Sequence, residues 1–227
     1  MRSWRRLAGV CGLGWFVLFA VGGIILQGEP PAYDQPIAEV RQFFADHGQS
    51  YLVGDYLSDL AFVFLFLPYV VGLRSHLGAA ENGGQIGSRL VVGGGLATVV
   101  VGAASTAFLD AVALADGGSA LNDSTIRALL YADAVAIAGI GMPAALLATA
   151  AAVVILRTRA LPWWLAPVGA GAGGLLVVGS AFPLEGNANG VLWTIRFIGF
   201  ISFALFVVLT SLNLIVSERT EPSTVPV

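Results

Sequence analysis

The sequence predicts an all-α protein that crosses a membrane six times, and three observations support this fold class. Hydrophobic residues make up 57% of the 227 residues, whereas charged residues make up only 11%. The mean hydropathy is +0.84, so the chain carries more apolar surface than a soluble domain of this size buries. Six stretches reach the roughly 20 apolar residues that a helix needs to cross the hydrocarbon layer. We therefore expect the lipid bilayer to surround most of the chain.

The six apolar stretches define the expected spans and domain organisation. They occupy residues 7–27, 52–73, 90–112, 126–156, 163–182 and 191–216. We expect a single six-helix transmembrane domain over residues 1–219, followed by a short cytoplasmic tail at 220–227. The fourth stretch is longer than a span requires, so it should tilt or kink at Pro143.

The arginine distribution predicts the orientation of the spans. All 11 basic residues are arginines, and eight of them lie on one side: Arg2, Arg5, Arg6, Arg74, Arg89, Arg157, Arg159 and Arg219. Because cytoplasmic loops carry the excess of positive charge, we expect both termini in the cytoplasm and the acidic loops outside. The absence of lysine and the abundance of Gly, Ala and Val are typical of a GC-rich bacterial genome. The expected location is therefore the bacterial cytoplasmic membrane.

The first outer loop contains a segment with helical periodicity, at residues 34–47. Asp34 can cap a helix there. The apolar residues of this segment recur at the spacing of one helix face: Ile37, Val40, Phe43 and Phe44. We expect a short interfacial helix that lies on the membrane surface or covers the bundle. The alternative is a plain connector that rests on the outer helix ends.

The first, third and fifth spans are rich in glycine. Small residues let helix backbones approach closely where lipid provides no hydrophobic driving force between helices. Gly169 and Gly173 form the small-x-x-x-small pair that is typical of such contacts. We expect these three spans to provide close packing surfaces.

Several functions lack support in the sequence. The net charge of −3 and the absence of a basic run after Arg6 argue against a nucleic-acid partner. The chain contains no Walker loop, H-E-x-x-H, G-x-S-x-G or C-x-x-C motif, so we expect no catalytic residue and no cofactor. A Gly-Ala-Gly-Ala-Gly-Gly pattern fits a dinucleotide fingerprint, but it lies in an apolar span without a preceding strand. Cys11 is the single cysteine, and the two histidines are expected on opposite sides of the membrane, so we expect no metal site.

Five ionisable residues lie within the spans, all towards the expected outer side, and form the candidate site: Asp55, Asp59, Asp110, Asp133 and Arg196. Ionisable groups in hydrocarbon are costly and are functional candidates by default. Four acids and one base leave an excess of negative charge, which a dry pocket cannot hold. Protons, outside water or a bound cation must compensate for it. The pattern predicts an outward polar pocket that binds or conducts a small cation, a proton or an amine-bearing solute.

Two other interpretations of these residues remain open. In the first, Arg196 pairs with Asp59 or Asp133 and locks the bundle, while the other acids lie in interfacial water. The chain is then a non-catalytic scaffold or an accessory subunit with a membrane-protein partner. The second is an intramembrane enzyme, because paired aspartates support acid–base chemistry, although no nucleophile or metal triad accompanies them.

Two stretches resemble a known protein family. One reads Tyr51-Leu-Val-Gly-Asp-Tyr-Leu-Ser-Asp-Leu-Ala and continues to Val71-Gly-Leu-Arg74, and the other reads Leu161-Pro-Trp-Trp-Leu-Ala-Pro-Val-Gly169. They are similar to segments of bacterial, mainly actinobacterial, six-span membrane proteins that form a family of unknown function. The resemblance implies a six-helix fold and no established activity or ligand. Asp59 matches an acidic position of that family, whereas no counterpart is matched to Asp110 or Arg196.

Overall fold

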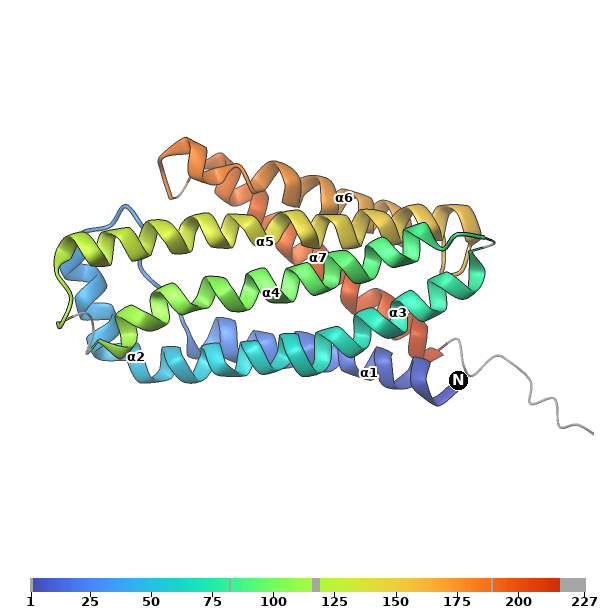
Figure 1. Cartoon of the computed structure of the whole chain (residues 1–227), viewed down its shortest axis with the longest axis horizontal. Coiled ribbons are helices and arrows are strands. Elements are labelled where there is room, and N and C mark those ends of the chain that lie inside the picture. Colours follow the sequence, from blue (N-terminus) through green and yellow to red (C-terminus); the bar gives the residue numbers. More distant parts are fainter. Residues whose placement is uncertain (1, 82, 116–118, 189, 217–227) are drawn as a thin grey trace, which may run out of the picture.

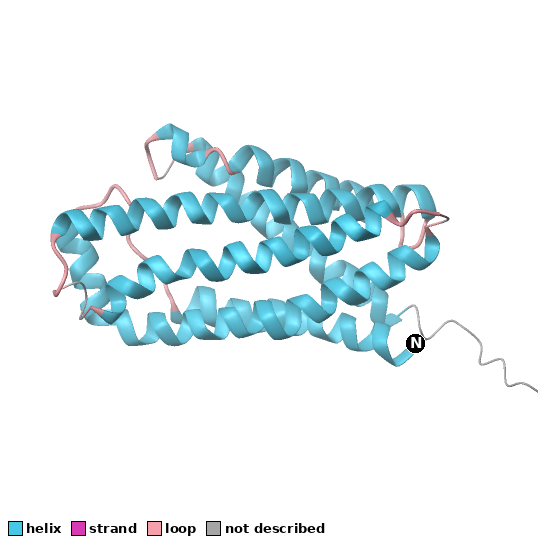
Figure 2. Cartoon of the chain, viewed as in Figure 1, coloured by secondary structure: helices cyan, strands magenta, loops and turns pink. Residues whose placement is uncertain are grey.

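The computed structural model describes residues 2–81, 83–115, 119–188 and 190–216. These residues form helices joined by loops, and none of them forms a strand (Figure 2). Six helical segments are long and apolar enough to cross a membrane. The predicted all-α architecture with six spans is therefore confirmed. The tail expected at 220–227 lies outside the described residues.

The helices follow the expected spans closely at most ends. The first two spans comprise α1 (Arg2–Phe19), η1 (Ala20–Leu26), α2 (Ile37–Leu60), η2 (Ala61–Phe66) and α3 (Leu67–Ala80). The other four comprise α4 (Ile86–Leu114), α5 (Asp123–Thr158), α6 (Leu165–Gly179), the 3₁₀ turn η3 (Phe182–Glu185) and α7 (Val191–Val216). The stretches η1 and η2 are π-helical, so their backbone N–H groups bond to carbonyls five residues earlier.

The second span is longer than the sequence indicated. Residues 37–80 form one continuous helical run, and the expected separate helix at 34–47 joins the span without a break. No proline follows Pro36 before the span, so nothing there forces the helix to end. The first turns of α2 lie across the ends of α4 and α5 (Figure 1, light blue). Side chains of the three helices are buried together there: Val40, Phe44, Val112 and Ile126.

The longest single α-helix, α5, has clear end signals in its sequence. Asn122 is the N-cap, and its side chain accepts a 2.9 Å hydrogen bond from the backbone N–H of Thr125. Asp123 lies in the first turn and Arg157 in the last, where each charge complements the helix dipole. The helix continues through Pro143. With these signals at its ends, α5 extends beyond both ends of the apolar stretch 126–156.

Consecutive spans are neighbours, and the last span closes on the first. α4 packs against α3 and α5, α6 packs against α5 and α7, and α7 packs against α1. α1 in turn packs against α3. Short loops favour this order, because they make successive helices antiparallel neighbours. The chain therefore forms a closed up-and-down bundle of six spans (Figure 1).

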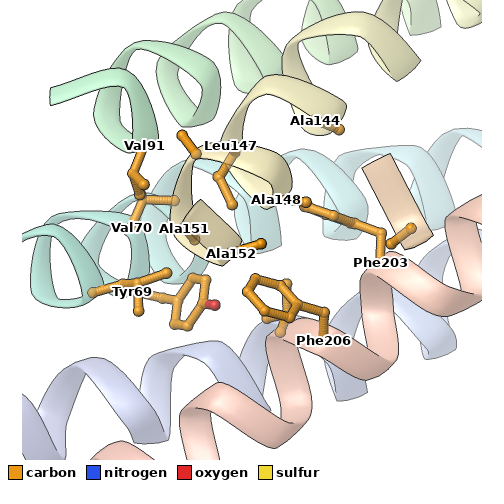
Figure 3. Packing of buried hydrophobic residues seen from close by; sticks show 14 of the residues in the cluster. Tyr69, Val70, Val91, Ala144, Leu147, Ala148, Ala151, Ala152, Phe203 and Phe206 are labelled. Carbon is orange, nitrogen blue, oxygen red and sulfur yellow. The ribbon is translucent and has the colours of Figure 1, made fainter. Parts of the chain in front are cut away.

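The largest apolar core lies in the half of the bundle that includes α3 and the end of α7. Figure 3 shows the rings of Tyr69, Phe203 and Phe206 gathered around small side chains of α5. Gly169 and Gly173 of α6 also pack against α5, because a Cβ on either would lie 3.0 or 3.2 Å from an α5 carbonyl oxygen. The expected glycine contact of the fifth span is therefore confirmed.

Candidate functional site

The five predicted site residues lie towards the same end of the bundle, beyond the main core. Asp55 and Asp59 precede Ala61, where their helical run enters the main core, and Asp110 follows Val99, where α4 leaves it. Asp133 and Arg196 likewise precede the points where α5 and α7 enter the main core, at Ala144 and Phe203. Four helices therefore carry ionisable side chains into the same end of the bundle.

Asp55 is the most enclosed of the four acids, with only 2% of its surface exposed. Its Oδ1 accepts a 2.7 Å hydrogen bond from Nε2 of Gln27, the residue that follows η1. Its carboxyl group also lies within electrostatic range of Asp110 on α4. The structure thus adds Gln27 to the residues predicted from the sequence.

The proximity of Asp55 and Asp110 has a chemical consequence. Two ionised carboxylates repel each other, and neither can donate a hydrogen bond to the other. Oδ1 of Asp110 is buried, and no hydrogen-bond donor among the described residues reaches it. A proton on one of the two groups would supply a donor and remove the repulsion between them.

Asp59 and Asp133 complete the group of acids. Asp59 lies one turn after Asp55 on α2, and both Asp59 and Asp133 interact electrostatically with Asp55. The buried side chain of Tyr51 is within electrostatic range of Asp55, Asp110 and Asp133. We call the four acids Asp55, Asp59, Asp110 and Asp133 the carboxyl cluster.

Arg196 does not form the hydrogen bond to Asp59 or Asp133 that the sequence suggested. Its Nη2 donates to the carbonyl of Ile137 at 3.3 Å. The guanidinium carbon lies 5.5 Å from the centre of the Phe182 ring and 5.1 Å from that of Trp193. In the described parts of the chain, no carboxylate lies within 4.0 Å of this guanidinium.

The aromatic contacts explain this difference. A guanidinium is attracted to the faces of aromatic rings, and a backbone carbonyl accepts one of its N–H groups. Gly179 of α6 also packs directly on the backbone of Arg196, which fixes the start of the side chain. Arg196 still interacts electrostatically with Asp133. It thus faces the carboxyl cluster without a direct ion pair to it.

Two π-helical stretches flank the cluster. η1 ends directly before Gln27, and η2 begins two residues after Asp59. The backbones of η1 and α2 touch, since a Cβ on Gly22 of η1 would lie 2.5 Å from the carbonyl oxygen of Gly54 on α2. This approach brings Gln27 against Asp55. π-Helical turns within α-helices occur frequently at functional sites.

Asp55 is the buried member of the carboxyl cluster, whereas Asp59, Asp110 and Asp133 are partly exposed. Two surface grooves, of about 520 Å³ beside Phe43 and about 800 Å³ beside Arg157, are lined by other described residues and by none of the five site residues. Towards the middle of the bundle, the Trp15 ring lies 5.7 Å from that of Phe62 and 5.2 Å from that of Phe66. No group of three or more His, Cys, Asp or Glu side chains suited to a metal ion occurs among the described residues.

The chain before α2 is tied across the same end of the bundle. Arg127 donates a 2.6 Å hydrogen bond to the carbonyl of Tyr33, and the backbone of Ala188 donates to Asp34. Burial, together with the nearby negative charges of Asp34 and Glu185, raises the pKa of Tyr33. These contacts connect α5 and the start of α7 through the segment that precedes α2.

Comparison of the chain with protein-family models, curated proteins and solved structures finds no match. The resemblance to the actinobacterial six-span family therefore stays a prediction. The function is inferred from the geometry of the carboxyl cluster.

Proposed function

We propose that this multi-pass membrane protein binds a proton, or a small inorganic or amine cation that displaces it, in the carboxyl cluster. The observation that carries the proposal is Oδ1 of Asp110, which is buried without a donor among the described residues and lies near the buried carboxyl group of Asp55. A proton or a bound cation would satisfy this oxygen and offset the repulsion between the two carboxylates. Asp59 and Asp133 add negative charge nearby. Arg196 compensates only in part, because it is one cation beside four acids and its guanidinium contacts Ile137 and two rings in place of a carboxylate.

Binding is favoured over conduction through the bundle. Beyond the cluster the core is apolar, and Trp15, Phe62 and Phe66 pack ring against ring there. A hydrated ion that passed this layer would lose its water without gaining polar ligands. We therefore propose that the solute enters and leaves at the end of the bundle where the cluster lies.

That end faces outward in our proposal, and both termini are cytoplasmic. Most arginines lie at the other end, as expected for a bacterial cytoplasmic-membrane protein. Topology reporters placed after Arg74 and after Arg157 should then report the cytoplasm, and reporters near Gln35 and Asn187 the outside. An external signal from the reporter placed after Arg157 would contradict this orientation. We further propose membership of the actinobacterial six-span family, on the residues that carry the resemblance.

One observation favours a second candidate function, a non-catalytic scaffold or accessory subunit. Neither of these two surface grooves is lined by a residue of the carboxyl cluster, and Asp55 itself is only 2% exposed. In this alternative the acids are protonated and hold α2, α4 and α5 together. The two functions differ in their response to cations.

A thermal-shift series in detergent separates the two functions. Unfolding of the wild type and of the Asp55→Asn/Asp110→Asn variant is followed over pH and with added Na⁺, K⁺ or polyamine. A ligand that binds only the folded form stabilises it by about 2.7 kcal/mol at 100 times its Kd. Binding in the cluster predicts a shift in the wild type that the variant lacks.

The matched control for this series is Asp46→Asn, which changes an exposed acid near the same end of the bundle. The control variant should keep the wild-type shift. If no added cation produces a shift that depends on Asp55 and Asp110, cation binding is refuted and the scaffold function is retained.

A further inference from the structure

A separate groove lies at the arginine-rich end of the bundle. It has a volume of about 800 Å³ and follows the outer face of α5 from Leu146 to Thr158. The loop between α3 and α4 and the first turns of α4 form its other wall. Arg157 lies 24 residues beyond Asp133 on α5, or about 36 Å along the helix. The groove is therefore remote from the carboxyl cluster.

The long part of this groove is apolar and open. Leu90, Leu146 and Val153 line it, and each is more than 40% exposed. The apolar part of the α5 wall runs from Leu146 to Val154, which is about 12 Å at a helical rise of about 1.5 Å per residue. One leaflet contributes about half of the roughly 30 Å hydrocarbon thickness. The apolar wall is thus long enough to contact an acyl chain over most of one leaflet.

The rim of the groove carries a guanidinium that the structure leaves accessible. Arg157 is exposed in the last turn of α5, and no carboxylate of the described residues lies within 4.0 Å of it. Glu81, the nearby acid, is already engaged, because its two oxygens accept hydrogen bonds from the backbone N–H groups of Gly87 and Ser88 at 3.2 and 2.9 Å. Arg157 therefore retains donors for another acceptor.

We propose that this groove binds one glycerophospholipid, with the phosphodiester on Arg157 and an acyl chain against Leu90, Val153 and Leu146. A guanidinium matches two phosphate oxygens at once, and such charge-assisted pairs are strong. Arg89, exposed near the same end, adds positive charge around the head group. The groove therefore matches an amphiphilic ligand whose acyl chain contacts the apolar wall along α5 and whose anionic head group lies at the rim.

Native mass spectrometry of the full chain in detergent tests this proposal. Phosphatidylglycerol, phosphatidylethanolamine and diacylglycerol, which lacks the phosphate, are each added at equal concentration. Both phospholipids should remain bound to the wild type, and diacylglycerol should be lost. Arg157→Gln should lower the retained phospholipid about tenfold, as expected for the loss of a charge-assisted hydrogen bond.

Two further variants complete the test. Arg159→Gln removes the same charge two residues away, from a side chain that does not line the groove, and should retain lipid as the wild type does. Val153→Phe fills the apolar wall and should displace lipid while Arg157 remains. Equal retention of diacylglycerol and phospholipid, or unchanged retention by Arg157→Gln, would overturn the proposal. A dimer that forms in place of the lipid complex would also overturn it.

Discussion

Nε2 of Gln27 donates a 2.7 Å hydrogen bond to Oδ1 of Asp55, which joins the residue after η1 to α2 across 28 positions of sequence. The bond depends on the close crossing of Gly22 and Gly54, whose backbones touch beside it. Asp55 in turn lies within electrostatic range of Asp110 of α4. A single amide therefore helps to position the acid at the centre of the carboxyl cluster.

Replacement of Gln27 by alanine should destabilise the protein. The change removes a donor from a buried acceptor on Asp55, and such a loss costs about 1–3 kcal/mol. The measurement is the free energy of unfolding in a mixed-detergent titration. Gln49→Ala is the control, because Gln49 is exposed on the same helix as Asp55 and should change stability by less than about 0.5 kcal/mol. Equal losses in the two variants would show that the Gln27 contact contributes nothing specific.

Gly54→Ala should destabilise the protein more than any exposed glycine replacement. The new Cβ would lie 2.5 Å from the Gly22 carbonyl and 2.8 Å from the backbone nitrogen of Gln27. Neither backbone atom can move without separating the two helices, and overpacking typically costs about 1–3 kcal/mol or more.

The matched control for this change is Gly171→Ala in α6. A Cβ on Gly171 meets no atom within 4 Å, and alanine favours a helix by about 1 kcal/mol over glycine. The control variant should therefore be as stable as the wild type or slightly more stable. If thermal melting in detergent shows the two variants to be alike, the helix crossing is not a tight contact.

Stability should also depend on pH through Glu81, at the arginine-rich end. Burial raises the pKa of this carboxyl group, but hydrogen bonds from Ser88 and Gly87 and the charge of Arg157 outweigh it, so the pKa lies below its ordinary value near 4.5. A group with a lowered folded-state pKa stabilises the protein above its unfolded-state pKa, and this contribution is lost as pH falls through the folded-state pKa.

The measurement compares the wild type with Glu81→Gln in unfolding experiments from neutral pH downwards. The wild type should be the more stable above about pH 4.5, and the difference should shrink at lower pH. Glu29→Gln, an exposed acid near the opposite end, is the control and should not reproduce this trend. A difference that stays constant with pH would contradict the assigned role of Glu81.

Much of the fold could be predicted, because length and apolarity alone specify a membrane span. The sixth span, 191–216, coincides with α7, whereas residues 34–47 were expected as a separate helix and join α2. Helix ends are harder to predict than helix existence, because a helix continues wherever no residue stops it. The prediction was weakest where an interfacial segment leads directly into a span.

The site could be predicted only in part. Each acid was recognisable, because a charge inside a span is costly and therefore rare. The partner of Arg196 was not, since the sequence does not reveal that Phe182 and Trp193 present their ring faces to it. Gln27 gave no signal either, because an amide at the end of a span is ordinary. Partners across helices depend on helix rotation, which periodicity in a nearly uniform apolar sequence does not define.

The most direct test of cation binding in the carboxyl cluster is a count of the protons released when a cation is added. The protein is held in weakly buffered detergent at neutral pH and titrated with Na⁺, K⁺ or polyamine. If Asp55 and Asp110 share a proton that the cation displaces, the wild type should release about one proton for each cation bound, and the Asp55→Asn/Asp110→Asn variant should release none. No release from the wild type with any of these cations, or equal release from both proteins, would contradict the proposed function.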